Sequence, residues 1–357
     1  MERMSPELGL IEGFYGRPWP MPARREAVRF LKPHGYGFYL YAPKADARLR
    51  KRWRELHPEA EAQDLADLAA HCRAHGVRFG VGLSPYELYR GFDDEARAAL
   101  AAKLAQLDAL GLDDLAILFD DMRGDLPELA ERQPEIIDFA AERTAATRLI
   151  VCPSYYSDDP VLDRVFGVRP PEYLRDLGRR LDPTIQLFWT GEEVCSREYT
   201  SGDLDRVAEL LGRKPFLWDN YPVNDGPRMS QHLHLRGFTG RPASLASHVA
   251  AHGINVAVQP WLTLAPAVTL AMSYAHGDAY AYGDAFLQAA TLAYGAELAG
   301  RLQADLLSLD DAGLDRLGER RAKLRDRYAA FDHPAAVEVV DWLDGAYAIT
   351  PEEMLTS

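Results

Sequence analysis

Two adjacent carboxylates, Asp120 and Asp121, stand where catalytic groups could work together. They directly follow the apolar run at residues 115–119, where a helix cap or a turn has no obvious use for them. Like charges in a partly apolar cavity raise the pKa of one group, so one can stay protonated as a general acid while the other stays anionic. A structural hydrogen-bonding role for the pair is the alternative interpretation. Three other acidic pairs resemble turn or helix N-cap residues: Asp93-Asp94, Asp113-Asp114 and Asp158-Asp159.

Aromatic and polar side chains of the kinds that bind sugars stand in similar positions. A sugar ring stacks its C–H faces on aromatic rings, while its hydroxyl groups need polar partners such as Asn, Asp and Lys. The aromatic residues that follow apolar runs are Tyr15, Trp19, Tyr41, Tyr156, Trp189 and Trp218. Packing at the end of the fold is the alternative explanation for some of them. Lys44 also follows an apolar run, and because a buried charge is costly without a partner, we expect it to meet a carboxylate or a ligand hydroxyl.

A metal site is an alternative interpretation of the polar residues. His232 and His234 could place two imidazoles on one side of an extended segment, and together with Asp120 and Asp121 they would suit a metal-dependent barrel hydrolase. No third ligand adjoins the two histidines in the sequence, and the HExxH motif, the G-x-S-x-G elbow and the P-loop do not occur. We therefore expect neither a metal ion nor a cofactor.

The segments that must position these residues alternate between apolar runs and helix-like stretches. Eight apolar runs begin at residues 8, 37, 77, 115, 148, 185, 214 and 254, and helix-like stretches between them include 63–76, 95–111, 170–181, 201–212 and 245–253. Strands buried on both faces read as continuous apolar runs, so this pattern indicates an α/β fold, a (β/α)8 TIM barrel. A doubly wound sheet would also alternate, but GFYGRPW after the first run is not the G-x-G-x-x-G phosphate turn. Catalytic groups of a barrel lie at the carboxyl ends of its strands, where the residues above stand.

The pattern changes from about residue 279, after which only helix-like segments follow. We therefore divide the chain into a catalytic barrel at residues 1–278 and a C-terminal helical region at residues 279–357. A small bundle packed on the barrel is the simpler interpretation of this region, and a dimerisation or substrate-rim element is the alternative. A second copy of the chain is accordingly a candidate partner.

Composition limits the other partners. The 357 residues carry 54 acidic and 40 basic side chains and a net charge of -14, so we expect no attraction to nucleic acid or to anionic membranes. The first residues lack an apolar stretch of the length of a secretory leader or membrane span, which favours a cytoplasmic protein. The cysteines are widely separated and form no CxxC pair, so each is expected to be a small buried apolar residue: Cys72, Cys152 and Cys195.

Six motifs follow one another along the predicted strands. They are IEGFYGRPW at 11–19, YAPK at 41–44, LFDDM at 118–122, CPSYY at 152–156, WTG at 189–191 and WDNYPVND at 218–225. In kind and order they resemble the β-N-acetylglucosaminidases of glycoside hydrolase family 84, which includes the O-GlcNAcases. The resemblance spans most of the first 260 residues. It implies a retaining exo-glycosidase that uses the 2-acetamido group of the substrate as nucleophile, through a bicyclic oxazoline, without metal or cofactor.

The resemblance also implies a role for each matching residue. Asp120 would accept the acetamide N–H and orient that group, and Asp121 would protonate the leaving oxygen and then deprotonate water. The other implied contacts are Tyr156 with the acetamide oxygen, Trp218 as a wall of the acetyl pocket, Gly13 and Lys44 with the 3-hydroxyl, Asn220 with the acid pair, and Asp225 with the 4- and 6-hydroxyls. Adjacent carboxylates cannot easily stand on opposite faces of a glycosidic bond, whereas an orienting group and an acid can be neighbours.

Two positions depart from the family pattern. After the last strand the family has Asn-Pro, where this chain has Gln259-Pro260, and Asn255 stands earlier in the strand. Either Gln259 or Asn255 is therefore the candidate contact to the 6-hydroxyl. Tyr155 stands where the family usually has Glu or another polar residue, which affects the surroundings of Tyr156 and the aglycone preference.

The sequence thus predicts an enzyme that removes terminal β-linked GlcNAc from a glycoside or glycoprotein by substrate-assisted catalysis. One alternative is the metal-dependent barrel hydrolase. The other is a barrel that binds GlcNAc without turnover, although a binding site has little reason to keep the two crowded carboxylates Asp120 and Asp121.

Overall fold

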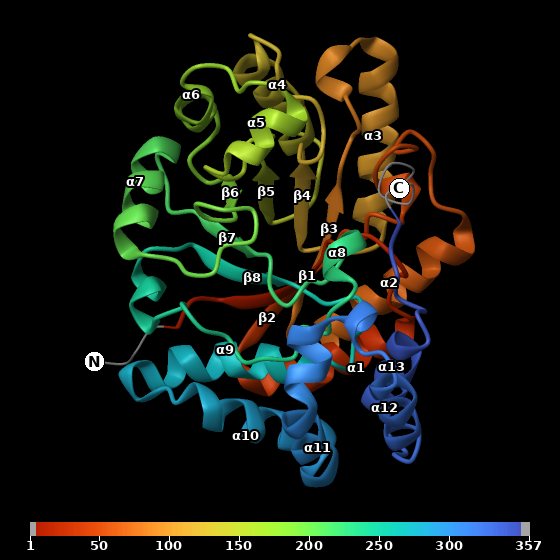
Figure 1. Cartoon of the computed structure of the whole chain (residues 1–357). Coiled ribbons are helices and arrows are strands. Elements are labelled where there is room, and N and C mark those ends of the chain that lie inside the picture. Colours follow the sequence, from red (N-terminus) through yellow and green to blue (C-terminus); the bar gives the residue numbers. More distant parts are fainter. Residues whose placement is uncertain (1–4, 351–357) are drawn as a thin grey trace.

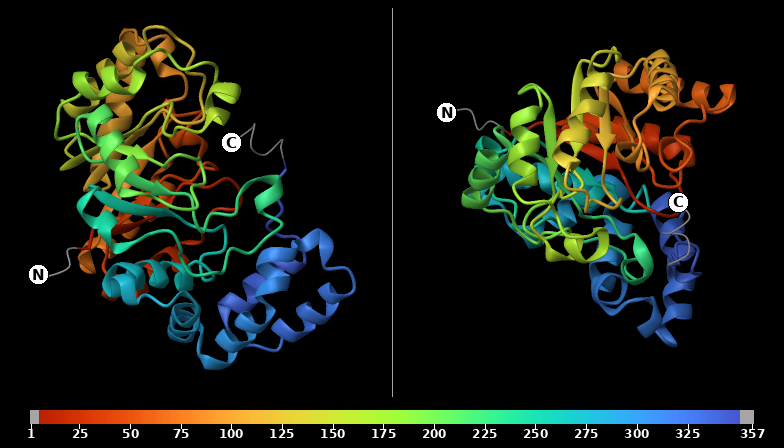
Figure 2. Two further views of the ribbon diagram at one scale, coloured as in Figure 1. Left: turned by 60° about the vertical axis from the view of Figure 1, so that its left-hand side comes forward. Right: turned by 90° about the horizontal axis from the view of Figure 1, so that it is seen from above.

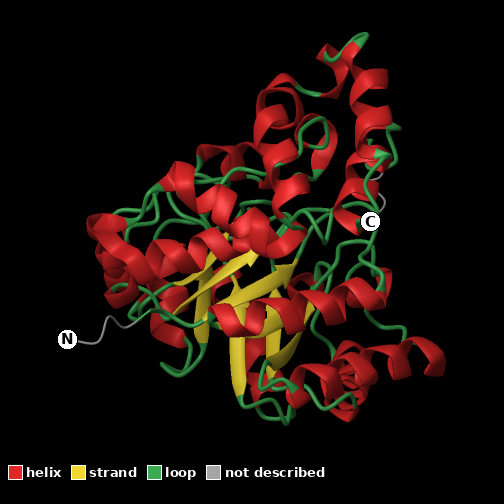
Figure 3. Cartoon of the chain, turned by 90° about the horizontal axis from the view of Figure 1, so that it is seen from below, coloured by secondary structure: helices red, strands yellow, loops and turns green. Residues whose placement is uncertain are grey.

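A closed barrel of eight parallel strands forms the centre of the computed structural model, which describes residues 5–350. The strands are β1 (Leu8–Glu12), β2 (Tyr36–Tyr41), β3 (Arg78–Leu83), β4 (Asp114–Leu118), β5 (Arg148–Cys152), β6 (Gln186–Trp189), β7 (Phe216–Asp219) and β8 (Ala251–Asn255). The barrel closes where β8 pairs with β1, so that Ile11 lies opposite Asn255. Figure 3 shows the strands at the centre with helices around them. The predicted (β/α)8 barrel is confirmed.

Helices that follow the strands form the outer layer of the barrel (Figure 1). They are α1 (Met21–Leu31), α2 (Glu59–Ala74), α3 (Asp94–Ala109), α4 (Leu129–Ala141), α5 (Pro160–Phe166), α6 (Tyr173–Arg180), α7 (Ser201–Leu211) and α9 (Leu264–His276), whereas the short α8 (Gly226–Met229) lies in the loop after β7. Local sequence explains their bounds: α7 begins after Thr200, whose hydroxyl accepts the N–H of Asp203, and ends before Gly212 at a φ of 68°. In residues 5–350 we find no helix with the length and apolar character that a membrane crossing requires.

The segment around β8 differs from the prediction. The stretch at 245–253 was expected to be helical, but a 3₁₀ turn occupies Ala243–Ser247, and the strand already begins at Ala251, three residues before the predicted position. His252 explains the difference. Its buried ring nitrogens contact the Tyr274 hydroxyl at 2.8 Å and the Asp219 carboxylate at 3.0 Å, so a polar residue is tolerated inside a buried strand.

The three acidic pairs that were predicted to be turn or cap residues have structural roles, but Asp114 was assigned wrongly. Asp93 and Asp159 cap α3 and α5, as predicted. Asp113 accepts the N–H of Phe79, whereas Asp114 is neither a turn nor a cap residue. It is the buried first residue of β4 and forms ion pairs with Arg78 and Arg148. The partners that make this carboxylate tolerable lie on other strands, so the local sequence did not reveal them.

The predicted C-terminal helical region consists of α10 (Tyr282–Tyr294), α11 (Ala296–Leu306), α12 (Arg320–Tyr328) and α13 (Pro334–Leu343). Figure 2 shows these helices gathered beside the barrel, on the side away from the N-terminus. The expected division at residue 278 falls in the 3₁₀ turn Gly277–Ala279, between α9 and α10. Residues 1–4 and 351–357 of the two predicted parts lie outside the described residues.

This region contacts loops that follow three of the strands. The buried carboxylate of Glu338 on α13 accepts the backbone N–H groups of Trp261, at 3.0 Å, and Leu262, at 2.9 Å, after β8. The indole of Trp342 donates to the carbonyl of Ser230, after β7. A β-carbon at Gly16, whose φ is 110°, would lie only 2.8 Å from the side chain of Ile349. The helical region therefore supports these loops from outside the barrel.

Candidate active site

Nine of the ten predicted site residues line one cavity of about 130 Å³ at the carboxyl ends of the strands. They are Gly13, Lys44, Asp120, Asp121, Tyr156, Trp218, Asn220, Asp225 and Asn255. A larger hollow, of about 830 Å³, lies at the opposite end of the barrel, where Arg78, Arg148 and Gln186 begin their strands. Barrel enzymes carry their sites at the carboxyl ends, so the smaller cavity is the candidate active site.

The carboxylates of Asp120 and Asp121 share one buried ammonium group. Lys44 forms an ion pair with Asp120 through Oδ2 and lies 3.3 Å from Oδ2 of Asp121. This confirms the expectation that Lys44 meets a carboxylate. Burial lowers the pKa of Lys44, but the two carboxylates outweigh burial and hold it above its ordinary value, so the group stays cationic. The other oxygen of Asp120, Oδ1, is buried and has no hydrogen-bond partner among the described residues.

Asp121 is held as a carboxylate by its surroundings. Burial raises its pKa, but the charges of Lys44 and Arg50 and a hydrogen bond from Tyr15 bring it below the ordinary value. The Tyr15 hydroxyl donates to Oδ2 of Asp121 at 2.9 Å, and the Tyr156 hydroxyl lies 3.5 Å from Oδ1. Asp121 has a φ of 57°, a left-handed conformation that persists in non-glycine residues only where surrounding contacts support it.

Asp225 lines the cavity and links two loops. Its Oδ2 accepts the backbone N–H of Tyr15 at 2.8 Å, which joins the loop after β7 to the loop after β1. Burial raises the pKa of Asp225 to about 6; the Tyr15 N–H acts against burial, and the charge of Asp121 adds to the rise. The site thus contains carboxylates with shifted pKa values in opposite directions, as acid–base sites commonly do.

Two amide side chains connect the walls of the cavity. Asn255 accepts the N–H of Gly13 at 3.2 Å and donates to Asn220 at 2.9 Å. Asn220 also accepts from the Trp218 indole at 3.0 Å and donates to the carbonyl of Val194 at 2.7 Å. Gly13 is required beside this indole, because a β-carbon there would lie 2.3 Å from the Trp218 ring. These contacts fix the Trp218 ring as one wall.

Several residues considered from the sequence lie outside the cavity lining. Gln259 is buried and accepts a hydrogen bond from Asn224 at 2.9 Å, so of the two candidates for the 6-hydroxyl contact only Asn255 lines the cavity. Tyr155 donates to the carbonyl of Gly167 at 2.6 Å and also lies outside the lining. Of the six aromatic residues, Tyr15, Tyr156 and Trp218 line the cavity, whereas Trp19, Tyr41 and Trp189 are buried outside its lining.

The sequence analysis missed some residues of the cavity. Cys195 lines it and is exposed, so the prediction that every cysteine is buried was wrong for this residue, although Cys72 and Cys152 are buried. Thr190 and Val194 line it as well. All three lie in the loop after β6, within or just beyond the WTG motif, so the motif was the signal for this loop. Which side chains of this loop face the cavity is decided by the tertiary structure.

The two histidines of the metal interpretation lie outside this cavity. His232 contacts the carbonyl of Asp310 at 2.8 Å, and His234 contacts the carbonyl of Val223 at 2.8 Å and stacks on Tyr221. Neither lines the cavity of the carboxylate pair, so the structure does not bring His232 and His234 together with Asp120 and Asp121. Over residues 5–350, no group of three or more His, Cys, Asp or Glu side chains is arranged to hold a metal ion.

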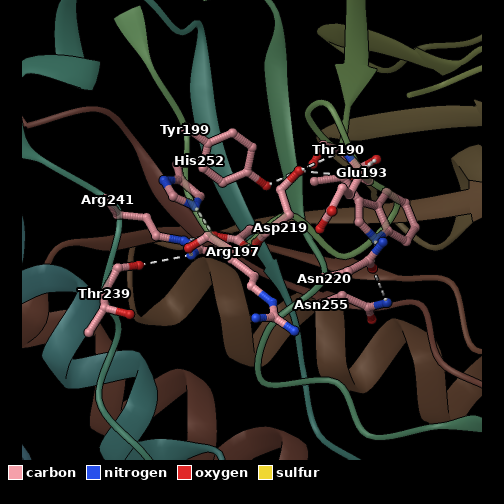
Figure 4. A network of polar contacts seen from close by, with 12 residues as sticks. Thr190, Glu193, Arg197, Tyr199, Asp219, Asn220, Thr239, Arg241, His252 and Asn255 are labelled. Carbon is pink, nitrogen blue, oxygen red and sulfur yellow. Dashed lines mark hydrogen bonds and ion pairs between the residues drawn. The ribbon is translucent and has the colours of Figure 1, made fainter. Parts of the chain in front are cut away.

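A buried ion pair lies directly behind the Trp218–Asn220 wall. Asp219, between these two residues, is fully buried and pairs through both oxygens with Arg241, at 2.6 and 2.8 Å, and through one of them with His252 (Figure 4). Burial raises the pKa of Asp219, but Arg241 and His252 outweigh burial and lower it below its usual range. The pair ties the loop after β7 to the end of β7 and to β8.

The order of these residues and the barrel agree with one known family. The sequence model described as beta-N-acetylglucosaminidase matches residues 8–305. The chain belongs to this family. The family resemblance of the sequence motifs is thereby confirmed.

Relatives within the beta-N-acetylglucosaminidase family include Protein O-GlcNAcase of Rattus norvegicus and of Mus musculus. Each is 31% identical over 248 residues, which is 66% of this chain and 26% of the relative. The chain therefore spans about a quarter of the length of these curated relatives. A solved structure of a mutant of Thermobaculum terrenum O-GlcNAc hydrolase aligns with a TM-score of 0.78 at 28% identity, covering 97% of this chain and 81% of that one.

We expect the Arg241→Leu variant to lose about 3 kcal/mol or more of its free energy of unfolding, because Asp219 would be left buried without its cation. The matched control is Arg325→Leu, which removes an exposed partner of Asp344 and should cost less than about 1 kcal/mol. Urea denaturation of the three proteins measures both differences. Equal losses in the two variants would show that the Asp219 pair adds nothing to stability beyond an exposed pair.

Asp225 should make stability depend on pH. Its pKa in the folded protein, about 6, lies above the ordinary 3.8, so folding disfavours the ionised form. The resulting destabilisation is absent below about pH 4, grows as the pH rises, and is complete above about pH 6. We therefore expect Asp225→Asn to raise the free energy of unfolding by about 3 kcal/mol at pH 7.5 and by much less at pH 4.

Denaturation at the two pH values tests this, with the exposed Asp278→Asn as the control. The control should change stability by the same amount at both. A difference between Asp225→Asn and the parent that stays constant from pH 4 to 7.5 contradicts the prediction.

Proposed function

We propose that the chain is a retaining exo-β-N-acetylglucosaminidase that cleaves terminal β-linked GlcNAc by substrate-assisted catalysis. The observation that carries the proposal is the unpartnered Oδ1 of Asp120, buried beside Asp121 in the cavity while Lys44 takes Oδ2. A buried carboxylate oxygen without a donor is costly, and the N–H of a 2-acetamido group is a donor of suitable size for this cavity. Tyr156 and Trp218, which line the same cavity, supply the walls for the acetyl group.

In the first step the acetamide oxygen attacks C1 of the sugar. Asp120 orients the acetamide and stabilises the positive charge that develops on its nitrogen, while Asp121 donates a proton to the glycosidic oxygen. The C1–O bond to the aglycone breaks, the aglycone leaves as an alcohol, and a bicyclic oxazolinium ion remains, its N–H hydrogen-bonded to the Asp120 carboxylate. In the second step the Asp121 carboxylate takes a proton from water, the water oxygen bonds to C1, and the acetamide reforms. Two inversions give net retention.

Asp121 needs a proton at the start of this cycle, although Lys44 and Arg50 favour its carboxylate in the free protein. A bound sugar displaces water from the cavity, and loss of water favours the neutral acid. We propose that substrate binding raises the pKa of Asp121. The Tyr15 hydroxyl, which donates to Oδ2 of the carboxylate, then supports the anion after the proton has left.

The remaining roles follow from where the side chains lie. We propose that Lys44 and the backbone at Gly13 bind the 3-hydroxyl, that Asp225 binds the 4- and 6-hydroxyls, and that Asn220 positions the pair and the indole. Asn255, and not Gln259, is the proposed residue near the 6-hydroxyl. The substrate is a GlcNAc-bearing glycoside or glycoprotein, and the names of the relatives support this class. A cytoplasmic location stays a prediction, supported by three unpaired cysteines, and the homodimer also stays a prediction.

The proposal predicts that cleavage requires the acetamide and resists chelation. We expect release of 4-nitrophenol from 4-nitrophenyl β-N-acetylglucosaminide, unchanged by EDTA, and at least about a thousandfold slower release from the matching β-glucoside. Absorbance of the released phenol measures both rates. Comparable rates on the two substrates would exclude an acetamide nucleophile, and loss of activity with EDTA would favour the metal-dependent alternative.

The two carboxylates should differ in how their loss depends on the leaving group. A general acid contributes about 10²–10⁴-fold where departure is difficult and least where it is easy. We expect Asp121→Ala to lose activity on an alkyl β-N-acetylglucosaminide by that factor, and much less on the 4-nitrophenyl one. Asp120→Asn should lose about 10²-fold or more on both substrates. The ratio of kcat/KM for the two substrates measures this, and an equal loss by Asp121→Ala on both would contradict its role as acid.

A further inference from the structure

A second cavity, of about 310 Å³, adjoins the candidate active site. The two cavities share Cys195 and Asn220 in their linings. The second one extends from this shared wall between the loops after β6 and β7 toward α10, where Tyr221, Phe238 and Tyr282 line it. The second cavity therefore lies next to the place that GlcNAc would occupy in the first.

The charged lining of this second cavity is mostly cationic. Its charged side chains are Arg197, Arg236, Arg241 and Asp310. Arg241 is neutralised by Asp219 and Arg236 by an ion pair with Asp311. The Oδ2 atom of Asp310 accepts the backbone N–H groups of Leu235 and Arg236, at 2.9 and 3.1 Å, so this carboxylate is engaged by the chain. No ion pair of the described residues neutralises Arg197 or Asp310, and of these two charged side chains only Arg197 can attract an anion.

Arg197 has no counterion in the described part of the chain. No carboxylate of residues 5–350 lies within 4.0 Å of its guanidinium, which is solvent exposed. Its backbone is fixed, because the carbonyl of Arg197 accepts a hydrogen bond from Arg241. Figure 4 shows Arg197 beside the buried Asp219–Arg241 pair, with its guanidinium joined to none of the residues drawn. The glutamates of the same loop, Glu192, Glu193 and Glu198, line neither cavity.

We propose that this second cavity is a subsite for an anionic group of the substrate, bound by Arg197. The inference rests on the proposed function, since it needs GlcNAc in the neighbouring cavity. A guanidinium binds carboxylate and phosphate through charge-assisted hydrogen bonds, and the aromatic lining packs against the carrier of the anion. The anion has two chemical sources: a carboxylate on the aglycone, or a phosphate on the 6-hydroxyl of the sugar. A free cation beside the active site of a chain with a net charge of -14 is suited to this selectivity.

Three substrates separate these sources: 4-nitrophenyl β-N-acetylglucosaminide, its 3-carboxy-4-nitrophenyl analogue, and the 6-phosphate of the first compound. The quantity measured is kcat/KM on each anionic substrate divided by kcat/KM on the neutral one. Comparing this ratio between proteins cancels differences in intrinsic reactivity. We expect it to fall about fivefold in Arg197→Gln for one of the two anionic substrates, and to fall in the parent as salt is added.

The matched control is Arg164→Gln on α5, an exposed arginine that lines neither cavity. It removes the same charge from the carboxyl-end face and should leave both ratios unchanged. Equal falls in the two variants would reduce the effect to net charge and overturn the subsite. Unchanged ratios in Arg197→Gln, with the neutral substrate still cleaved, would overturn the subsite and leave the proposed function intact. No cleavage of any of the three substrates by the parent protein would overturn both.

Discussion

The balance of charge around Lys44 governs the carboxyl end of the barrel. Asp120 and Asp121 stand side by side in the cavity, where Asp120 is buried and their mutual repulsion would oppose folding. The Lys44 ammonium contacts both and makes the arrangement tolerable, and Tyr15 supplies a further donor to Asp121. Lys44 contacts Oδ2 of Asp120, and Oδ1 has no hydrogen-bond partner within residues 5–350. A substrate that supplies a donor to this oxygen would remove an unfavourable feature of the folded protein.

The two ends of β4 differ in how far their carboxylates are supplied with partners. Acidic pairs stand at both of its ends, Asp113-Asp114 at the start and Asp120-Asp121 just beyond the end. At the start, two arginines pair with Asp114 and the backbone N–H of Phe79 donates to Asp113, so these carboxylates have partners within the barrel. At the other end, fewer cations and donors are provided than the carboxylates can accept. Barrel folds separate stability from function in this way, with the active site at the carboxyl ends of the strands.

The residues that shape the cavity depend on a supporting layer that closes the barrel. Since β8 lies between β7 and β1, Asn255 can connect Gly13 to Asn220, and His252 can reach Asp219 from behind. Around this layer, the C-terminal helices hold the loops after β1, β7 and β8. Two of these loops meet over the cavity where Tyr15 donates to Asp225. The helical region therefore contributes to the geometry of the site although its helices lie beside the barrel.

The sequence alone predicted the barrel from its apolar runs, and its motifs predicted the family and, through that resemblance, nine residues that line the cavity. The tertiary structure decided what depends on distant partners. The strand β8 begins earlier than predicted, since His252 is tolerated only beside Asp219 and Tyr274, and Cys195 is exposed although it was predicted to be buried. Gln259 accepts a hydrogen bond from Asn224, and the backbone N–H of Tyr15 donates to Asp225, 210 positions away. Side-chain direction at a strand end is set by such contacts across the barrel, and no local pattern encodes them.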